Sequence, residues 1–141
     1  MAISFQTENV KSPEIKKRKT SEWIKKIAGI YNKTIGEITY IFCDDDKILE
    51  VNRQYLNHDY YTDIITFDYS EGDKISGDIF ISLDTVKSNS QMYTTDYQEE
   101  LFRVIIHGVL HLCGLSDSSE DEKKKMRDAE NSALNILKTI D

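Results

Sequence analysis

The chain has 141 residues, of which 39% are hydrophobic and 30% are charged. This length and apolar content suit one compact domain with a core of its own, so we expect a single domain over residues 1–141. The formal net charge of −7 at pH 7 argues against tight, nonspecific binding of nucleic acid. The longest apolar stretches are too short to cross a bilayer, which excludes a membrane-spanning protein.

The N-terminal stretch MAISFQTENVK has neither a basic leader nor an apolar signal core. It therefore predicts a cytoplasmic protein. Cys43 and Cys113 fit that compartment as reduced, mostly buried thiols.

The first part of the chain predicts a strand followed by a helix. Residues 3–6 alternate like a short strand. Ser12 and Pro13 are typical of the cap and the first position of a helix. Apolar residues then recur at roughly helical spacing from Ile15 to Tyr31.

A second strand is predicted at residues 37–43, because Gly36 breaks the helical pattern and the residues that follow favour β-structure. Residues 44–46 are three aspartates that resemble a carboxylate metal cluster. They precede another helical pattern that reaches Tyr55, however, and acidic residues cap a helix and stabilise its positive end. We interpret the three aspartates as helix caps.

The remaining pattern predicts two strands, joined by a turn-rich segment, and then three helices. The elements are expected at residues 62–69, 77–83, 85–92, 96–113 and 119–140.

The last of these helices has clear boundaries and a clear buried face. Ser119 and Glu122 have the spacing of a capping box at its start. Its buried stripe is expected to contain Met126, Ala129, Ala133, Leu137 and Ile140.

The order of elements is strand, helix, strand, helix, two strands and three helices. This order implies two right-handed crossovers followed by a hairpin. The predicted fold class is therefore α+β, with a mixed four-stranded sheet and packed helices.

The stretch HGVLHLCGLSD, residues 107–117, places two of the three histidines four residues apart in an apolar run. On a helix, His107 and His111 share one face. The helix is apolar nearly all round between Leu101 and Leu112, so we expect it to be buried. The pair can be core histidines satisfied by hydrogen bonds, or ligands of one metal ion that serves both rings.

Asp117 favours the metal. Gly114 is where the helix should stop, since glycine readily adopts the left-handed conformation that ends helices, and Asp117 can then fold back toward the imidazoles. Two histidines and a carboxylate with an open fourth position are typical of catalytic zinc. The spacing matches the metzincin proteases, but Gly108 stands where those proteases carry a glutamate base, which disfavours a peptidase. We predict one Zn²⁺ per chain, held by His107, His111 and Asp117.

The motif closely resembles the signature of the YbeY family, the metallo-endoribonucleases that act as rRNA maturation factors. TDIITFD and GDIFIS are similar to that family's two strands before the catalytic helix, and EDEKKKM is similar to the acidic start of its last helix. The resemblance covers roughly residues 35 to 135.

The resemblance implies a zincin-like fold, one zinc ion and single-strand-specific cleavage of RNA. It further implies a role in maturing the 3′ end of small-subunit (16S) rRNA and in ribosome quality control. The implied partners are single-stranded RNA, the small ribosomal subunit and ribosomal proteins. His107 and His111 match the family's first two ligands and would act in catalysis through the metal-bound water.

The chain departs from the family pattern at two positions. The third ligand is usually histidine, where this chain has Asp117. An arginine usually follows the tyrosine upstream of the TD strand, where this chain has Leu56. Arg53 or His58 could replace the missing charge and contact the substrate.

Two surface features allow more than one interpretation. A basic segment could contact RNA or a ribosomal partner, or be a solvated helix face; it contains Lys16, Lys17, Arg18, Lys19, Lys25 and Lys26. A group of aromatic residues could stack bases or pack in the core, and we expect core packing for Phe67 and Tyr55; the group contains Tyr55, Tyr60, Tyr61, Phe67 and Tyr69.

Three classes of function are consistent with the sequence. The leading one is a zinc-dependent endoribonuclease of rRNA maturation. The second is a metal-dependent hydrolase of another phosphoester or amide. The third is a ribosome-associated binding protein in which the zinc is structural.

Overall fold

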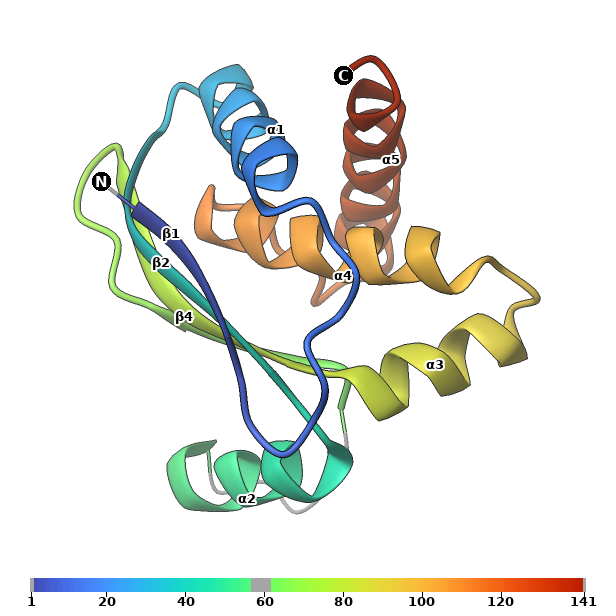
Figure 1. The fold of residues 1–141 in the computed structure, drawn as a ribbon. Coiled ribbons are helices and arrows are strands. Elements are labelled where there is room, and N and C mark those ends of the chain that lie inside the picture. The colour runs from blue at the N-terminus through green and yellow to red at the C-terminus, as the bar shows by residue number, and fades with distance from the viewer. Residues whose placement is uncertain (1, 57–61, 141) are drawn as a thin grey trace.

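A computed structural model describes residues 2–56 and 62–140. The elements follow in the predicted order (Figure 1). They are β1 (Ala2–Thr7), α1 (Lys17–Ile30), β2 (Thr34–Cys43), α2 (Asp45–Leu56), β3 (Ile64–Asp68), β4 (Lys74–Ser82), α3 (Leu83–Met92), α4 (Tyr97–Leu112) and α5 (Glu120–Leu137).

The four strands form one mixed sheet in the order β1-β2-β4-β3. The pairs β1–β2 and β2–β4 are parallel, and β3 is antiparallel to β4 at the edge. The predicted α+β class with a mixed four-stranded sheet is confirmed.

The second predicted crossover is wrong, because β3 does not lie beside β2. Strand β4 lies between them, and β3 therefore runs antiparallel to β2. The burial of the strands explains this order. Ile75, Ile79 and Ile81 of β4 are fully buried and need neighbours on both sides, whereas β3 is short and ends in exposed Asp68, as suits an edge strand.

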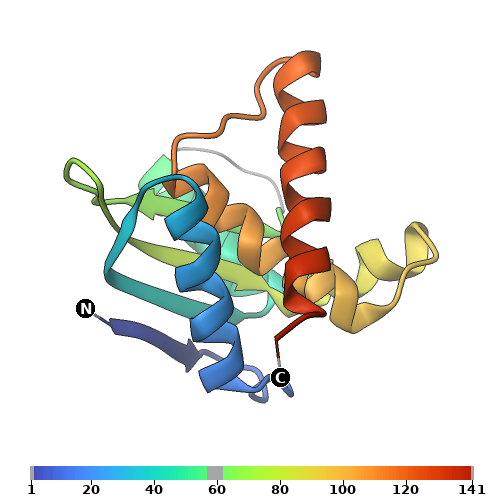
Figure 2. The same ribbon diagram turned by 90° about the horizontal axis from the view of Figure 1, so that it is seen from above.

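Helices cover the two faces of the sheet unequally. The helices α1, α4 and α5 lie over one face, and α2 lies against the other (Figures 1 and 2). The larger core cluster fills the first interface, with Trp23, Tyr40 and Ile105 fully buried in it. A smaller cluster under α2 contains Ile48 and Val51.

The first helix begins later than predicted, at Lys17 rather than at Pro13. Its first backbone bond runs from the Thr20 N–H to the Lys16 carbonyl, at 2.9 Å. The preceding segment is irregular, and Ile15 within it packs against the core. Ile15 is therefore partly buried although it lies outside the helix. Its apolar character made the predicted helix too long.

Gly36 does not end an element but lies inside β2. A Cβ atom there would collide with the Ser76 hydroxyl of the neighbouring strand β4. The pairing of the two strands also shifts register between Ile35 and Ile38. The glycine thus allows close approach at a bulge, a role that glycine has in strands as well as in turns.

The predicted caps are confirmed at two helices. At α2, the Asp44 carboxylate accepts a hydrogen bond from the Lys47 backbone N–H at 2.9 Å, so Asp44 caps this helix, while Asp45 and Asp46 lie in its first turn. At α5, Ser119 and Glu122 form a reciprocal capping box, with bonds of 3.1 and 3.0 Å.

Candidate active site

The helix α4 carries both histidines of the motif and packs directly on the sheet. Its residue Gly108 faces the sheet, where an added Cβ would lie 3.0 Å from Ile79 Cδ1 and 3.3 Å from Ile64 Cδ1. A glutamate at this position would have to push into the sheet. The glycine that separates this motif from the zinc proteases therefore has a packing reason, and the position does not face the histidines' pocket.

Helix α4 ends as the sequence predicts. Gly114 has a φ of +105°, in the region that favours glycine. The Gly114 N–H donates to the His111 carbonyl at 3.0 Å, and the Leu115 N–H donates to the Leu110 carbonyl at 3.1 Å. This pair of bonds is the Schellman pattern, which turns the chain back on itself.

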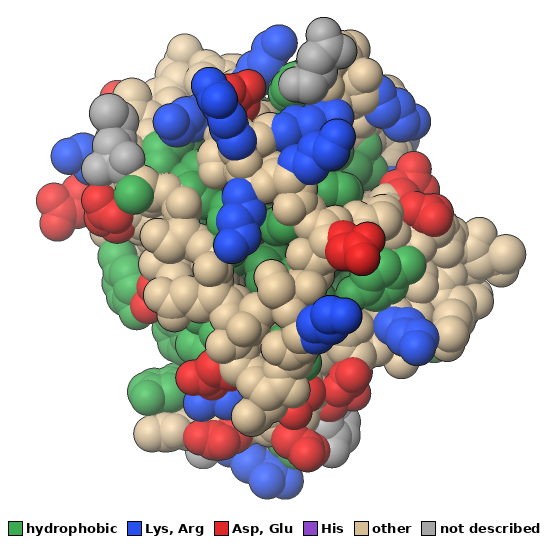
Figure 3. All heavy atoms as spheres, in the orientation of Figure 1, with side chains coloured by type: hydrophobic (Ala, Val, Ile, Leu, Met, Phe, Trp, Pro, Cys, Tyr) green, Lys and Arg blue, Asp and Glu red, His purple; other side chains and the backbone are tan. Residues whose placement is uncertain are grey.

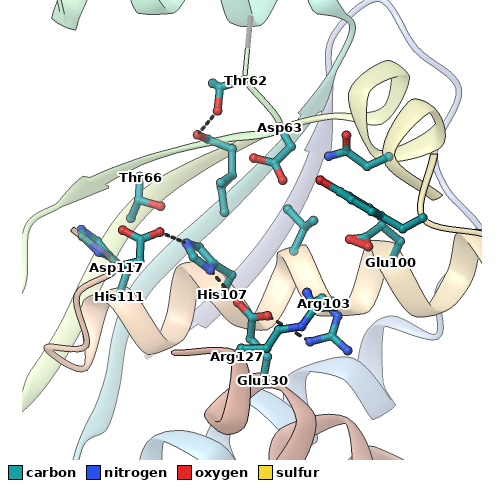
Figure 4. Close-up of a pocket in the computed structure, with 14 residues that line it drawn as sticks. Thr62, Asp63, Thr66, Glu100, Arg103, His107, His111, Asp117, Arg127 and Glu130 are labelled. Atoms are coloured by element: carbon teal, nitrogen blue, oxygen red, sulfur yellow. Dashed lines mark hydrogen bonds and ion pairs between the residues drawn. The ribbon is translucent and has the colours of Figure 1, made fainter. Parts of the chain in front are cut away.

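The turn brings Asp117 to His107. Its carboxylate Oδ2 lies 3.5 Å from Nε2 of His107, and the two side chains point toward one another in Figure 4. The predicted return of Asp117 toward the motif is thus present in the structure.

The other ring nitrogen of His107 is held by a residue that the sequence did not indicate. Nδ1 lies 2.7 Å from Oε2 of Glu130 on α5. The Glu130 side chain is only 8% exposed, and its second oxygen accepts a bond from Nη1 of Arg103 at 3.0 Å. Arg103 also donates to Asn131 at 2.8 Å. A chain of polar contacts from α5 therefore fixes the orientation of the His107 ring.

These charges act on the protonation of His107. Burial of the ring lowers its pKa and is the largest single effect. The hydrogen bond and charge of Glu130, with the charges of Asp117 and Asp63, together outweigh burial, so the pKa of His107 lies above its ordinary value. In the absence of a metal, the site favours a proton on this ring.

A pocket of about 840 Å³ opens along α4, β3 and α5 (Figure 4). Its polar lining includes Asp63, Glu100, Arg103, His107, His111, Asp117, Arg127 and Glu130. His111 lies one helical turn beyond His107 on the same pocket, and it is exposed. The volume falls in the range of ordinary ligand sites.

Two acidic residues line the pocket beyond the histidines. Burial is the main cause that raises the pKa of Asp63, with a further increase from Glu130 and an opposing effect of His107. Burial likewise raises the pKa of Glu100, where Arg103 opposes the shift. Both carboxyls hold a proton at higher pH than ordinary carboxyls do.

The side chains fit a zinc ion by their chemistry. A ligating imidazole usually donates its other N–H to a carboxylate, as Nδ1 of His107 does to Glu130, which leaves Nε2 for the metal. Asp117 already faces that Nε2. Within residues 2–56 and 62–140, no three His, Cys, Asp or Glu side chains are yet arranged to hold a metal. His111 would have to turn toward Asp117 to complete the set.

The residues predicted to contact substrate lie elsewhere or outside the described part. Arg53 and Leu56 belong to α2, which packs on the opposite face of the sheet, and Arg53 does not line the His107 pocket. His58, Tyr60 and Tyr61 lie outside the described residues. A substrate role for Arg53 and His58 stays a prediction.

The basic segment forms an exposed face on α1. Lysine and arginine side chains gather over this helix in Figure 3, while acidic side chains gather over α2. Among the described helices, none is long and apolar enough to cross a membrane.

The residues of the aromatic group differ in how far they are buried. Phe67 packs against the smaller core cluster, and Tyr55 meets it edge to face, with ring centroids 5.8 Å apart. Tyr69 is 58% exposed, and its hydroxyl donates to Oδ2 of Asp78 at 3.4 Å. Core packing is therefore confirmed for Phe67 and is wrong for Tyr55, which is 61% exposed.

Sequence reasoning missed Arg103, Glu130, Arg127, Asp63 and Glu100. Two signals were present. Arg103 lies four residues before His107 and so shares its face of the helix. Glu130 lies between Met126 and Ala133 on the buried side of α5, and a glutamate in an apolar stripe needs a partner.

The fold and the pocket define an α+β protein with a histidine and carboxylate centre between a helix and a sheet edge. Comparison with a solved structure agrees on the fold. The solution structure of TM1509 from Thermotoga maritima superposes with a TM-score of 0.70 and 24% identity, covering 96% of this chain and 89% of that one.

Sequence comparison shows the family. The sequence model of the family described as Endoribonuclease YbeY matches residues 3–138. A protein named Endoribonuclease YbeY from Bacteroides fragilis is 64% identical over 138 residues, covering 98% of this chain and 99% of that protein. One of the same name from Porphyromonas gingivalis is 52% identical over 136 residues, covering 96% and 90%. The chain belongs to the YbeY endoribonuclease family.

Proposed function

We propose that this chain is a zinc-dependent, single-strand-specific endoribonuclease that matures the 3′ end of 16S rRNA and acts in ribosome quality control. Family membership supports the RNA-cleaving activity. The observation that carries the metal dependence is the state of His107, whose Nδ1 is held by Glu130 while its Nε2 faces Asp117. Such an arrangement is typical of a zinc-binding histidine.

His107, His111 and Asp117 would hold the ion and leave its fourth position open. When bound, zinc lowers the pKa of its water toward ~7 and stabilises charge that develops on a phosphoryl oxygen. Glu130 and Arg103 keep His107 in one orientation, which preorganises the site.

The rest of the pocket supplies proton transfer and binding of the RNA backbone. Asp63 lines the pocket and keeps its proton to higher pH than an ordinary aspartic acid, so it can protonate the leaving oxygen. Arg127 is exposed in the same pocket and can meet a phosphate. Arg127 would thus supply a charge that the arginine usual at the Leu56 position supplies in the family.

The zincin-like class of the fold, a cytoplasmic location and contacts with the small subunit or ribosomal proteins belong to the same proposal. The basic face of α1 is the surface best suited to an RNA or ribosomal contact, because Lys17, Lys25 and Lys26 are solvent-exposed.

Zinc content and cleavage, measured together, test the proposal. The purified protein should hold about one zinc per chain. It should cut single-stranded RNA slowly and spare duplex RNA and peptides. Chelation should abolish cutting, and zinc should restore it.

Each other outcome contradicts the proposal in a different way. Cutting that survives complete chelation would exclude metal catalysis. Cleavage of another phosphoester or of an amide, but not of RNA, would indicate a different hydrolase. Bound zinc without any cleavage would indicate a ribosome-associated binding protein.

A further inference from the structure

The end of the pocket that lies away from the histidines is lined by the carboxyl of Glu100. Glu100 lies in the first turn of α4 and is only 8% exposed. Among the residues that the structure describes, no hydrogen bond or ion pair to its carboxyl is found, and its oxygens are not among the buried atoms without a partner, so they are open to the pocket. Arg103, the nearest basic residue along the helix, is already bound to Glu130 and Asn131. Burial raises the pKa of this carboxyl and the charges of Arg103 and Arg127 oppose the shift, so the carboxylate can accept hydrogen bonds from a ligand in the pocket.

Two further side chains line the same pocket from the helix that precedes α4. Asn89 of α3 and Tyr93, which ends that helix, both line it. Tyr93 is 63% exposed, although large aromatic side chains are usually covered. An amide, a carboxyl and an exposed ring therefore line the same pocket.

These three groups fit a flat ring that carries hydrogen-bond donors on its edge. An exposed aromatic face stacks on any nucleobase. A carboxylate accepts hydrogen bonds from the amino groups of bases, and an amide can donate and accept beside it. Guanine offers two adjacent donors to the two carboxylate oxygens, whereas uracil has no amino group.

The position of this subsite suits a nucleotide bound at the histidines. Glu100 precedes His107 by seven residues on α4, which corresponds to roughly 10 Å along the helix axis. One nucleotide spans a similar length from its phosphate to the far edge of its base.

We propose that Tyr93, Asn89 and Glu100 form a nucleobase subsite that prefers guanine to uracil beside the scissile phosphate. The inference rests on the proposed nuclease function. It adds sequence preference to that function, and assigns the preference to the α3–α4 end of the pocket.

Titration of the purified protein with GMP and UMP, followed by NMR chemical shifts, tests the subsite. The two nucleotides share their phosphate and ribose, so a difference in affinity reports on the base. We expect GMP to bind at least about fivefold more tightly than UMP, with shifts at Tyr93 and Glu100. Glu100→Gln should remove this difference, and Tyr93→Ala should weaken both nucleotides.

Glu99→Gln is the matched control, because Glu99 is the exposed neighbour of Glu100 and does not line this pocket. It should keep the wild-type preference. Equal affinities of GMP and UMP for the wild type, or an unchanged preference in Glu100→Gln, would overturn the subsite.

The result is separable from the proposed function. RNA cutting by a protein that does not distinguish the nucleotides leaves the nuclease standing and removes the subsite. A guanine preference in a protein that cuts no RNA leaves the subsite standing and removes the nuclease.

Discussion

The two ends of the pocket differ in whether their charged side chains are paired with one another. At one end, His107 contacts Glu130 and Asp117, and Glu130 in turn contacts Arg103. At the other end, the Glu100 side chain is largely buried, and no hydrogen bond or ion pair to its carboxyl is found among the described residues. Paired charges fix a geometry before a ligand arrives, whereas an unpaired group gains its partner only when a ligand binds. This contrast is the reason that we propose a metal at the first end and a substrate at the second.

The largest effect that this comparison predicts is at His107. His107→Ala removes the ring that lies between the Asp117 and Glu130 carboxylates, and also leaves Glu130 without its closest partner. We expect zinc affinity to fall by at least about 1,000-fold, beyond the loss typical of outer residues of metal sites. RNA cleavage should vanish with the metal. Elemental analysis gives the zinc content, and circular dichroism checks that the variant is folded.

Zinc that stays at full occupancy in the double variant His107→Ala with His111→Ala would contradict the assignment of both histidines.

Asp117 gives the next largest effect and tests the third ligand. Asp117→Ala should weaken zinc binding by about 100-fold or more, whereas Asp117→His should restore it, because imidazole also suits zinc. The histidine variant removes one negative charge, so the pH profile of cleavage should shift downward as the bound water becomes more acidic. Competition with a chromogenic chelator measures each affinity.

Asp121→Ala is the control for Asp117, since Asp121 is an exposed carboxylate at the start of α5. If Asp117→Ala keeps its zinc and loses only about 1 kcal/mol of stability, Asp117 is a surface residue and not a ligand.

Glu130 should have a smaller effect, because it orients a ligand without binding the metal. Glu130→Gln keeps the size of the side chain and removes its charge. Zinc affinity should fall by about 10- to 100-fold, as is common for a residue that supports a metal ligand. The control Asp128→Asn changes an exposed carboxylate of the same helix and should leave the affinity unchanged. An equal loss in both variants would mean that net charge, and not the contact with His107, controls binding.

The smallest effect is expected at the unpaired end and appears in stability. The raised pKa of Glu100 means that the folded state binds the proton more tightly than the unfolded state does. This contribution to stability is present below the ordinary glutamate pKa and is lost as pH rises through the raised value. Glu100→Gln should therefore stabilise the metal-free protein at pH 7, by about 1 kcal/mol, and should lose this advantage near about pH 4. Urea unfolding at both pH values measures the difference.

Glu99→Gln should show no such change at either pH. A destabilised Glu100→Gln variant at pH 7 would mean that the carboxylate is paired in solution, which would remove the contrast between the two ends.

The sequence predicted the centre with the motif better than it predicted the surroundings. His107, His111, Gly114 and Asp117 follow from local rules, since helix periodicity and a glycine stop act within a few residues. Asp117 accordingly reaches His107 as expected. The contact between His107 and Glu130 joins residues 23 positions apart, and it depends on how α5 crosses α4. No local pattern determines that crossing.

The fold shows the same division between local and distant effects. The capping box at Ser119 was predictable because both partners lie within one turn. The place of β4 between β2 and β3 was not, because strand order depends on which strands need two neighbours to bury their side chains. The place of Gly36 inside a strand could not be predicted for a similar reason. Its close neighbour Ser76 is 40 positions away in the sequence and lies beside it only in the sheet.

The most direct test of the central claim is anomalous diffraction at the zinc edge from crystals of the zinc-loaded protein. The account predicts one peak per chain, about 2.0–2.1 Å from the ring nitrogens of His107 and His111 and about 2.0–2.2 Å from the Asp117 carboxylate. Nδ1 of His107 should still contact Glu130. A peak bound by other side chains, or no peak in this pocket, would contradict the account.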